Sequence, residues 1–155
     1  YEPRLGTAFV HTVIDDHSRV AYAEIHADEK AQTAIGVLRR AVSWFADRGV
    51  TIERVLSDNG SCYRSATFRD AVGTSRHQRI TPYTPRHNGK VERYNRILAE
   101  EFLYARTWHS EDERATALEV WNRHYNYHRP HGAHDGQPPA SATPTRVNNL
   151  MTSYS

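Results

Sequence analysis

Two short segments near the start of the chain are rich in β-branched and aromatic residues. They cover residues 7–14 (TAFVHTVI) and 20–25 (VAYAEI), and the polar cluster DDHSR at residues 15–19 separates them. This pattern predicts two antiparallel strands joined by a turn. Between residues 29 and 48 the apolar positions instead recur at steps of three and four, which predicts an amphipathic helix ending at Gly49. The apolar stripe of that helix comprises Ala31, Ile35, Leu38, Val42 and Phe45.

The middle of the chain alternates between short apolar runs and turn residues. Residues 52–56 (IERVL) predict a further strand, which the turn residues SDNGS at 57–61 end. A short helix is expected over residues 65–72 and a short strand over residues 77–80. Because residues 52–56 have no room for a hairpin partner before them, we expect a helical crossover to bring this strand into the same sheet as the first two.

Helical spacing resumes after a loop that contains two prolines. The loop is predicted over residues 82–89, and the apolar spacing that follows predicts a helix over residues 91–105. A last helix is predicted from Ser110 to about His128, because Ser110 is a good N-cap and Glu113 stands at the capping-box position.

Together these elements predict one mixed α/β domain. Residues 1–134 are expected to form this domain. Residues 135–155 are rich in Pro, Ser, Thr and Asn and poor in apolar residues, so we expect a polar tail or linker there. In open sheets of this kind, sites form beyond the carboxyl ends of the strands, and Asp58 follows such an end.

Composition narrows the class of protein. The chain has 155 residues, of which 38% are hydrophobic and 25% charged, and this balance is typical of a folded protein. No stretch approaches the ~20 apolar residues of a membrane-spanning helix, so we expect no membrane partner. Cys62 is the only cysteine, which excludes a disulfide within the chain and favours a reducing cytoplasm. Met151 is the only methionine, so we expect the chain to be a piece of a longer protein.

Basic side chains are concentrated in one segment. The formal net charge of the whole chain is only +2, whereas residues 76–96 contain six basic side chains and a single acidic one, Glu92. Eighteen of the 20 basic residues in the chain are Arg, whose planar guanidinium group suits phosphate oxygens. A solvated basic face is one interpretation of this segment, and a track for the phosphate backbone of a nucleic acid is the other.

Asp58 and Glu92 are the candidate catalytic residues. Each alone has an ordinary structural explanation, since Asp favours the first position of a turn and Glu favours the first turn of a helix. On the predicted helix, however, Glu92 shares one face with Asn95 and Arg96 in the centre of the basic segment. The opposite, apolar face carries Val91, Tyr94, Leu98 and Phe102.

A carboxylate in a phosphate-attracting surface implies a cation. Glu92 would repel a phosphate unless a positive ion lay between the two groups. Mg²⁺ or Mn²⁺ fits this position, because such hard ions prefer oxygen ligands and keep waters or substrate phosphates in their remaining sites. Two such ions would activate a water or hydroxyl nucleophile for displacement at phosphorus.

Four ordered blocks of the sequence resemble the catalytic cores of retroviral integrases and bacterial insertion-sequence transposases. The blocks are VIDDHSR at residues 13–19, LSDNGS at 56–61, PRHNGKVERYNR at 85–96 and YNYHRPH at 125–131. The last block resembles the closing motif of the bacterial transposases. The resemblance spans nearly the whole chain and implies an RNase H-like fold, in which helices flank a mixed sheet. It also implies metal-dependent cleavage and strand transfer of DNA, a dimer or larger assembly, and action on the nucleoid in a bacterial cytoplasm.

The resemblance implies roles for individual positions. Asp58 and Glu92 match the second and third metal-binding carboxylates of an Asp-Asp-Glu triad. Asn95 and Arg96 match positions that face DNA, whereas Ala99 stands where the retroviral pattern often has another basic residue. The expected DNA-binding set, drawn from the basic segment and its loop, is Tyr83, Arg86, Lys90, Arg93, Asn95 and Arg96.

The first Asp of that triad has no counterpart in this sequence. In the family it lies on the first strand, ahead of the strand predicted over residues 7–14, so the expected fold lacks that strand. Asp15 and Asp16 match a turn with a structural role, and Glu2 stands beside Pro3, a poor strand residue. Two carboxylates do not readily hold two divalent ions. We therefore expect this chain to bind metal weakly and to have little or no strand-transfer activity, whereas its parent protein would have both.

Other residues support other hypotheses. His124, His128 and His131 fall at steps of four and three and suggest zinc, but Pro130 interrupts a shared helical face and no cysteine pair accompanies them. Cys62 is more typical of a small packed residue than of a nucleophile. The tryptophans, Trp44, Trp108 and Trp121, are expected to be core or interface anchors.

Two other functions stay open from the sequence. One is a catalytically silent DNA-binding or dimerisation module derived from such a core, which would need no metal ion. The other is a structure-selective nuclease on the same RNase H-like fold, which would use water as its attacking group and would not accept a 3′-hydroxyl.

Overall fold

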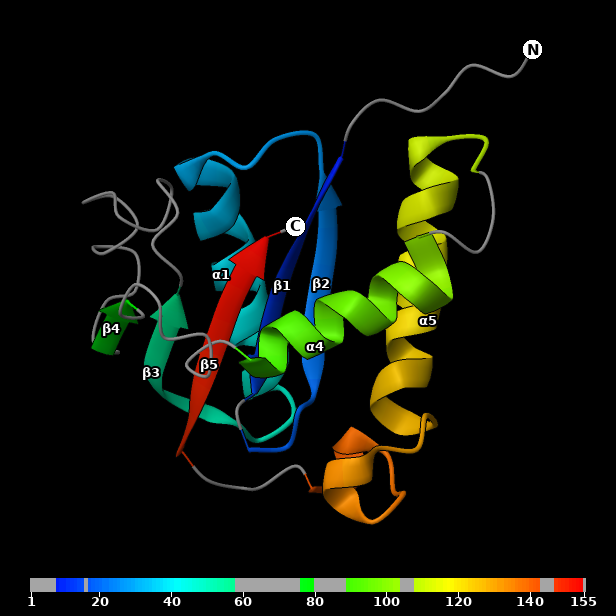
Figure 1. Cartoon of the computed structure of the whole chain (residues 1–155). Helices are drawn as coiled ribbons and strands as arrows, with labels where there is room; N and C mark the ends of the chain where they lie inside the picture. Colours follow the sequence, from blue (N-terminus) through cyan, green and yellow to red (C-terminus); the bar gives the residue numbers. More distant parts are fainter. Residues whose placement is uncertain are drawn as a thin grey trace.

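The computed structural model describes residues 8–15, 17–57, 76–79, 89–103, 108–142 and 147–154. In these residues, helices cover both faces of one sheet (Figure 1). Helix α1 lies on one face, and helices α4 and α5 lie on the other. The predicted mixed α/β class is therefore confirmed.

The first two strands form the predicted antiparallel pair. Strand β1 spans Phe9–Asp15 and strand β2 spans Ala21–His26, with Ile14 opposite Ala21 in the register. All side chains from Val10 to Asp15 are buried. Strands pair with both edges of β1 and helices cover both of its faces, which explains this burial.

The remaining strands continue the sheet beyond β1. Strand β3 spans Thr51–Ser57, β4 spans Arg76–Arg79 and β5 spans Val147–Tyr154. The strand order is β2-β1-β5-β3-β4, in which β3 is parallel to β4 and β5 while β5 is antiparallel to β1. The predicted helical crossover thus brings β3 into the sheet of the first two strands, although β3 is not adjacent to either of them.

The position of β5 differs from the expectation for the C-terminal segment. The sequence predicts a polar tail or linker over residues 135–155, whereas residues 147–154 form the central strand of the described sheet. The segment VNNLMTSY has no apolar–polar alternation and contains two Asn, which strands disfavour, so its composition does not reveal a strand. Pairing on both edges, with β1 and β3, is what forms it.

Helix α1 spans Ala31–Ala46 and covers one face of the sheet. Its side chains pack against Val13, Val20 and Val50. Val42, which the sequence places on the apolar stripe, is 36% exposed, because the buried stripe is rotated toward Ala41. The residues buried on the helix are Ala34, Ile35, Val37, Leu38, Ala41 and Phe45.

The second face of the sheet is covered by two helices. Helix α4 spans Gly89–Leu98 and continues as a π-helix over Ala99–Leu103, which confirms the helix predicted over residues 91–105 as far as residue 103. Helix α5 spans Glu111–Tyr127, and the Ser110 hydroxyl caps it by accepting the Glu113 backbone N–H at 3.0 Å. The predicted capping residue is thus confirmed.

Aromatic residues fill the contact between these two helices. The Tyr94 ring of α4 lies 4.9 Å from the Tyr125 ring of α5, measured between centroids, and the Phe102 ring lies 6.3 Å from Trp121 and 4.8 Å from Trp108. Trp44 instead packs on Phe45 on the other face, at 5.0 Å. All three tryptophans are therefore anchors of packed clusters, as the sequence analysis expects.

Three predicted segments lie outside the described residues. They are residues 58–61 of the turn predicted at 57–61, the short helix at 65–72, and residues 82–88 of the loop predicted at 82–89, whereas Ser57 belongs to β3 and Gly89 to α4.

A proline in β5 tests the central position of this strand. Leu150 stands opposite Asp15 of β1 and Val55 of β3, so Leu150→Pro removes a ladder hydrogen bond inside the sheet. A lost buried hydrogen bond costs about 1–3 kcal/mol, and each kcal/mol lowers Tm by roughly 2–4 °C in a chain of this size. Glu111→Pro is the control, because Pro is well tolerated at the first position of a helix. Equal Tm values for the two variants in thermal unfolding would contradict a paired central strand.

Candidate nucleic-acid and metal-binding site

Helix α4 has the two faces that the sequence predicts, except that Asn95, which was expected beside Glu92 on the polar face, is turned toward the sheet. Val91, Tyr94 and Leu98 are fully buried against the sheet and α5. Glu92 and Arg96, like Arg93, are exposed. The helix therefore presents a carboxylate and two guanidinium groups to solvent within one and a half turns.

The Glu92 carboxylate makes no hydrogen bond or ion pair within the described part of the chain, although Arg93 and Arg96 are close in sequence. Its oxygens are available to a cation or a ligand. Lys90, at the start of the same helix, is half-buried.

Asn95 has a structural contact on the side of α4 that faces the sheet. Its Oδ1 accepts the hydroxyl of Thr12, on β1, at 2.9 Å. Thr12 is completely buried, so this bond fixes the helix on the central part of the sheet. The DNA contact that the resemblance implies for Asn95 stays a prediction, and this bond occupies one of its two polar groups.

Three predicted site residues, Asp58, Tyr83 and Arg86, lie outside the described residues. Strand β3 ends at Ser57, the residue before Asp58. The position of Asp58 relative to Glu92 therefore also lies outside the described residues. In the described ranges, no three His, Cys, Asp or Glu side chains gather as metal ligands.

Asp15 is a turn residue. Its carboxylate accepts the Ser18 hydroxyl at 2.6 Å and the Ser18 backbone N–H at 3.1 Å, and no part of it is exposed. These bonds close the turn between β1 and β2, which agrees with the structural role that the resemblance implies. The two other acids considered from the sequence, Asp16 and Glu2, lie outside the described residues.

The block YNYHRPH joins α5 to the sheet through amide groups. Asn126 accepts the Ala21 backbone N–H at 2.8 Å and donates to the Ala21 carbonyl at 2.8 Å. Asn122, one turn earlier, donates to the same carbonyl at 2.9 Å and accepts the Tyr94 hydroxyl at 2.7 Å. Because β2 is the terminal strand on this side of the described sheet, these amides take the place of a neighbouring strand. Sequence analysis missed both residues, and two Asn four positions apart inside a helix were the available signal.

His131 ends the same block and is 3% exposed. Its Nδ1 accepts the Ala133 backbone N–H at 3.1 Å and so caps a 3₁₀ helix over Gly132–His134. Burial, followed by the positive charges of Arg93 and Arg19, lowers the pKa of His131 from 6.5 to about 4. His131 is therefore a neutral imidazole at pH 7.

Protein-family models match the parts of the chain that contain the four sequence blocks. Two family models, each described as an integrase core domain, match residues 2–85 and residues 74–139. The first match alone covers more than half of the chain. The chain belongs to the integrase core domain family. The resemblance based on four sequence blocks is confirmed at this level.

Solved integrase cores share the fold of this integrase core domain. The catalytic core of BIV integrase has a TM-score of 0.68 and 17% identity, over 91% of this chain and 88% of that one. The HTLV-2 core, solved in a trimeric form with magnesium, has a TM-score of 0.66 and 15% identity, over 93% and 90%. A chain of the simian T-cell lymphotropic virus intasome has a TM-score of 0.73 and 22% identity, over 92% and 50%. The expected RNase H-like fold is confirmed.

Curated relatives are longer proteins. The Pol polyprotein from the tobacco (Nicotiana tabacum) transposon TNT 1-94 is 32% identical over 100 residues, which are 62% of this chain and 7% of that protein. Putative integrase ORF3 of Spiroplasma virus SpV1-C74 is 24% identical over 152 residues, or 84% and 40%. This chain thus spans less than half of either relative. None of its described helices has the length and apolar content needed to cross a membrane.

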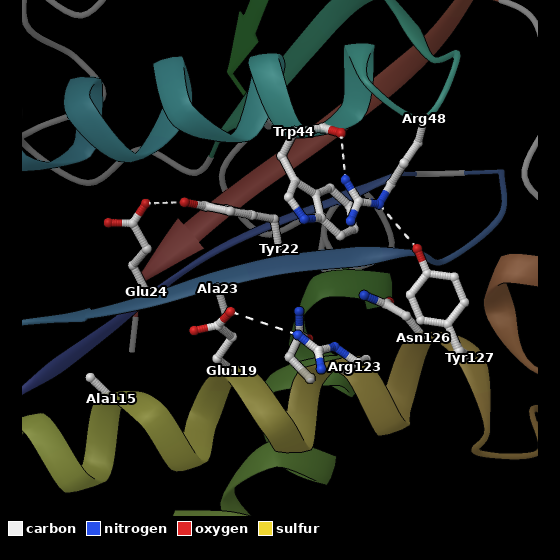
Figure 2. Close-up of a pocket in the computed structure, with 11 residues that line it drawn as sticks. Tyr22, Ala23, Glu24, Trp44, Arg48, Ala115, Glu119, Arg123, Asn126 and Tyr127 are labelled. Carbon is white, nitrogen blue, oxygen red and sulfur yellow. Dashed lines mark hydrogen bonds and ion pairs between the residues drawn. The ribbon is translucent and has the colours of Figure 1, made fainter.

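A pocket of about 390 Å³ opens at the outer edge of this integrase core domain, between α1, β2 and α5 (Figure 2). The Arg48 guanidinium lies 3.6 Å from the centre of the Trp44 ring and donates to the Tyr127 hydroxyl at 3.0 Å. Arg123 and Glu119 face each other across 3.8 Å on α5. None of the predicted catalytic or DNA-binding residues lines this pocket, so it is separate from the candidate site on α4.

Removing the Asn126 amide tests the link between α5 and β2. Asn126→Ala leaves the buried polar groups of Ala21 with fewer partners, and we expect the free energy of unfolding to fall by about 1–3 kcal/mol. Denaturant unfolding measures this change. Arg123→Ala, at an exposed position on the same helix, is the matched control and should change the free energy by less than about 0.5 kcal/mol. Similar losses in both variants would contradict the role of the amide.

The lowered pKa of His131 predicts an acid-sensitive fold. Between about pH 6.5 and pH 4 the unfolded chain binds a proton at His131 and the folded chain does not, so stability falls as pH falls through this window. His11, whose pKa burial also lowers, contributes in the same direction. Tm measured against pH should therefore decline over this range, and less steeply in His131→Asn, which keeps an N-cap acceptor but does not titrate. Parallel Tm profiles for the two proteins would contradict the assignment.

Proposed function

We propose that this chain is the catalytic core of a polynucleotidyl transferase that cleaves DNA and joins its ends to target DNA, as in transposition or integration. One observation carries the proposal: on an integrase core fold, the unpaired carboxylate of Glu92 is exposed on α4 beside Arg93 and Arg96. A carboxylate for a cation and guanidinium groups for phosphates are the two requirements of metal-assisted chemistry at phosphorus.

The residues fall into two groups by role. Asp58 and Glu92 would hold Mg²⁺ or Mn²⁺, and the free oxygens of Glu92 fit a hard divalent ion. When bound, such ions polarise a phosphoryl oxygen and lower the pKa of water. The DNA-binding residues, which would orient the strand by its phosphates and stack an unpaired base, are Tyr83, Arg86, Lys90, Arg93, Asn95 and Arg96.

The proposed reaction is displacement at phosphorus in two stages. In cleavage, water attacks a phosphodiester, its oxygen bonds to phosphorus, and the 3′-oxygen leaves and takes up a proton. In transfer, that 3′-hydroxyl attacks a phosphodiester of the target DNA and loses its proton, while a target 3′-oxygen leaves. Each stage exchanges one P–O bond for another, so no covalent bond between protein and DNA is needed.

The central strand limits the activity expected of this chain. Strand β5 lies between β1 and β3, and its sequence contains no Asp or Glu. A triad needs a third carboxylate, and β5 does not supply it. This supports weak metal binding and little strand transfer by the chain as it stands, with activity residing in a parent protein that supplies the missing Asp.

The proposal extends to assembly and location. The HTLV-2 integrase core was solved in trimeric and dimeric forms, and a further relative was solved within an intasome. We infer that this chain also forms a dimer or larger assembly on DNA, with element ends and target as its partners. The single cysteine is consistent with work in a reducing bacterial cytoplasm.

A catalytically silent DNA-binding or dimerisation module is the second candidate, and the lack of a carboxylate in β5 favours it for this chain taken alone. A structure-selective nuclease is the third. Incubation with labelled DNA ends and Mn²⁺ separates them: hydrolysis without joining indicates the nuclease, whereas robust joining would show that the chain already holds a full set of carboxylates.

Replacing Glu92 tests the metal role directly. In Glu92→Gln, we expect the heat of Mn²⁺ binding in the presence of DNA to disappear, because the amide has lost the charge that attracts the ion. DNA binding without metal should be retained or strengthened, since a negative charge leaves the basic face. In the parent protein the same change should abolish cleavage and joining.

Glu100→Gln is the matched control for that titration. Glu100 is exposed farther along the same helical segment, so the charge change is identical while the candidate site is untouched. Equal Mn²⁺ heats for wild type, Glu92→Gln and Glu100→Gln would contradict the metal role of Glu92.

A further inference from the structure

Two segments that are distant in sequence meet at one end of the domain. They are the turn between β1 and β2 and the 3₁₀ helix that follows α5 (Figure 1). His134 of the 3₁₀ helix bonds to the Ser18 carbonyl in the turn, with 2.7 Å between Nε2 and oxygen. Arg19 of the turn and Arg93 of α4 are both among the charges that act on His131 and on Tyr125, so both side chains lie within electrostatic reach of these rings.

Arg19 has an unusual backbone. Its φ is 67°, in the left-handed region that long side chains rarely adopt, so the backbone is strained there. The conformation is held by the bond from Arg19 N–H to the Asp15 carbonyl, at 2.9 Å, and by the carboxylate of Asp15, which binds Ser18. A glycine would fit this position without strain. The structure thus retains an arginine where its backbone is unfavourable.

The Arg19 side chain is not neutralised. Its Nε is buried and has no hydrogen-bond partner. In the described residues neither Arg19 nor Arg93 pairs with a carboxylate, whereas Arg129, the third cation near His131, binds Glu101 at 2.7 Å. His131 itself is uncharged at pH 7, so within the described part of the chain the charges of Arg19 and Arg93 have no carboxylate to balance them.

An anion explains these features together. Buried donors in proteins are nearly always satisfied, and a guanidinium group presents a planar fork that matches phosphate oxygens. The turn that carries Arg19 is fixed by the bonds of Asp15, Ser18 and His134, so the group is held in place before a ligand arrives. Packing alone would account for the position of the alkyl chain but not for a buried Nε that has no partner.

We propose that Arg19 and Arg93 together bind a backbone phosphate of DNA, at a site separate from the carboxylates that would hold metal. The inference rests on the proposed function, because it takes the DNA of that function as the source of the phosphate. Arg19 does not belong to the basic segment at residues 76–96 and comes from the turn between β1 and β2, far from that segment in the sequence. The contact fixes the register of the duplex on α4 without reading its sequence.

Arg19→Gly separates binding from folding. The variant removes the guanidinium group and also the backbone strain, so its Tm should equal or exceed that of wild type. Its affinity for a random-sequence duplex, measured without metal at about 0.1 M salt, should fall at least about tenfold, as expected for a lost bond to a charged group. The slope of log K against log salt should become shallower by about 1. Arg93→Gln should weaken binding in the same way.

Arg39→Gln is the control for net charge. Arg39 is exposed on α1, on the opposite face of the sheet, and its loss should leave affinity within about twofold and the salt slope unchanged. If Arg19→Gly and Arg39→Gln lose the same affinity, or if Arg19→Gly unfolds and Arg93→Gln behaves like Arg39→Gln, the phosphate site is overturned while the proposed function stands.

A second measurement keeps the two proposals distinguishable. Inorganic phosphate bound between Arg19 and Arg93 should shift the His131 ring signals in NMR spectra of wild type but not of Arg19→Gly. If wild type binds no DNA, the proposed function fails, and this titration then decides whether the anion site exists. An unchanged His131 signal in wild type would overturn the site.

Discussion

The domain depends on the burial of β1 from Val10 to Asp15. Val10 and Ile14 face the cluster formed with α4 and α5, whereas Val13 faces the cluster under α1. The strand therefore forms the centre of both cores, and strands pair with both of its edges. A polar residue of β1 also holds a helix in place, because the Thr12 hydroxyl donates a hydrogen bond to Asn95 of α4. The side of α4 that carries Glu92 points to solvent because the opposite side is fixed on β1 in two ways, by packing and by a hydrogen bond.

Much of this architecture could be predicted from local patterns. Composition and turn residues identified the first hairpin and β3, apolar spacing of three and four identified α1 and α4, and a capping pattern identified the start of α5. The exposed position of Glu92 followed from the same periodicity. The capping bond at Ser110 was equally accessible, since it joins residues only three apart. Val42 shows the limit of predicting a buried face from spacing alone. Two stripes of similar spacing exist on α1, and only packing against the sheet decides which of them is buried.

The rest could not be predicted because it depends on partners far away in the chain. Strand β5 is polar and irregular in sequence, and it becomes a strand only between β1 and β3, more than 90 residues earlier in the chain. Asn126 bonds to a residue 105 positions away, and no local pattern reports that its amide faces Ala21 rather than water. The left-handed backbone of Arg19 is equally hidden, since the sequence DDHSR predicts a turn without specifying which residue takes the unusual φ. Strand β5 and Asn126 could not be predicted because they depend on hydrogen bonds between residues far apart in the sequence, which the hydrophobic pattern does not show.

The charges on α4 couple the two ligands that the proposed function requires. Without a cation, Glu92 opposes the attraction between DNA and the guanidinium groups of Arg93 and Arg96. A divalent ion at Glu92 reverses that opposition, so the ion strengthens DNA binding. By thermodynamic reciprocity, DNA strengthens ion binding by the same factor. A weak metal site with too few carboxylates would then be occupied chiefly when a phosphate supplies further oxygen ligands. Because the two basic residues are on the same helix as Glu92, this coupling requires no change of conformation.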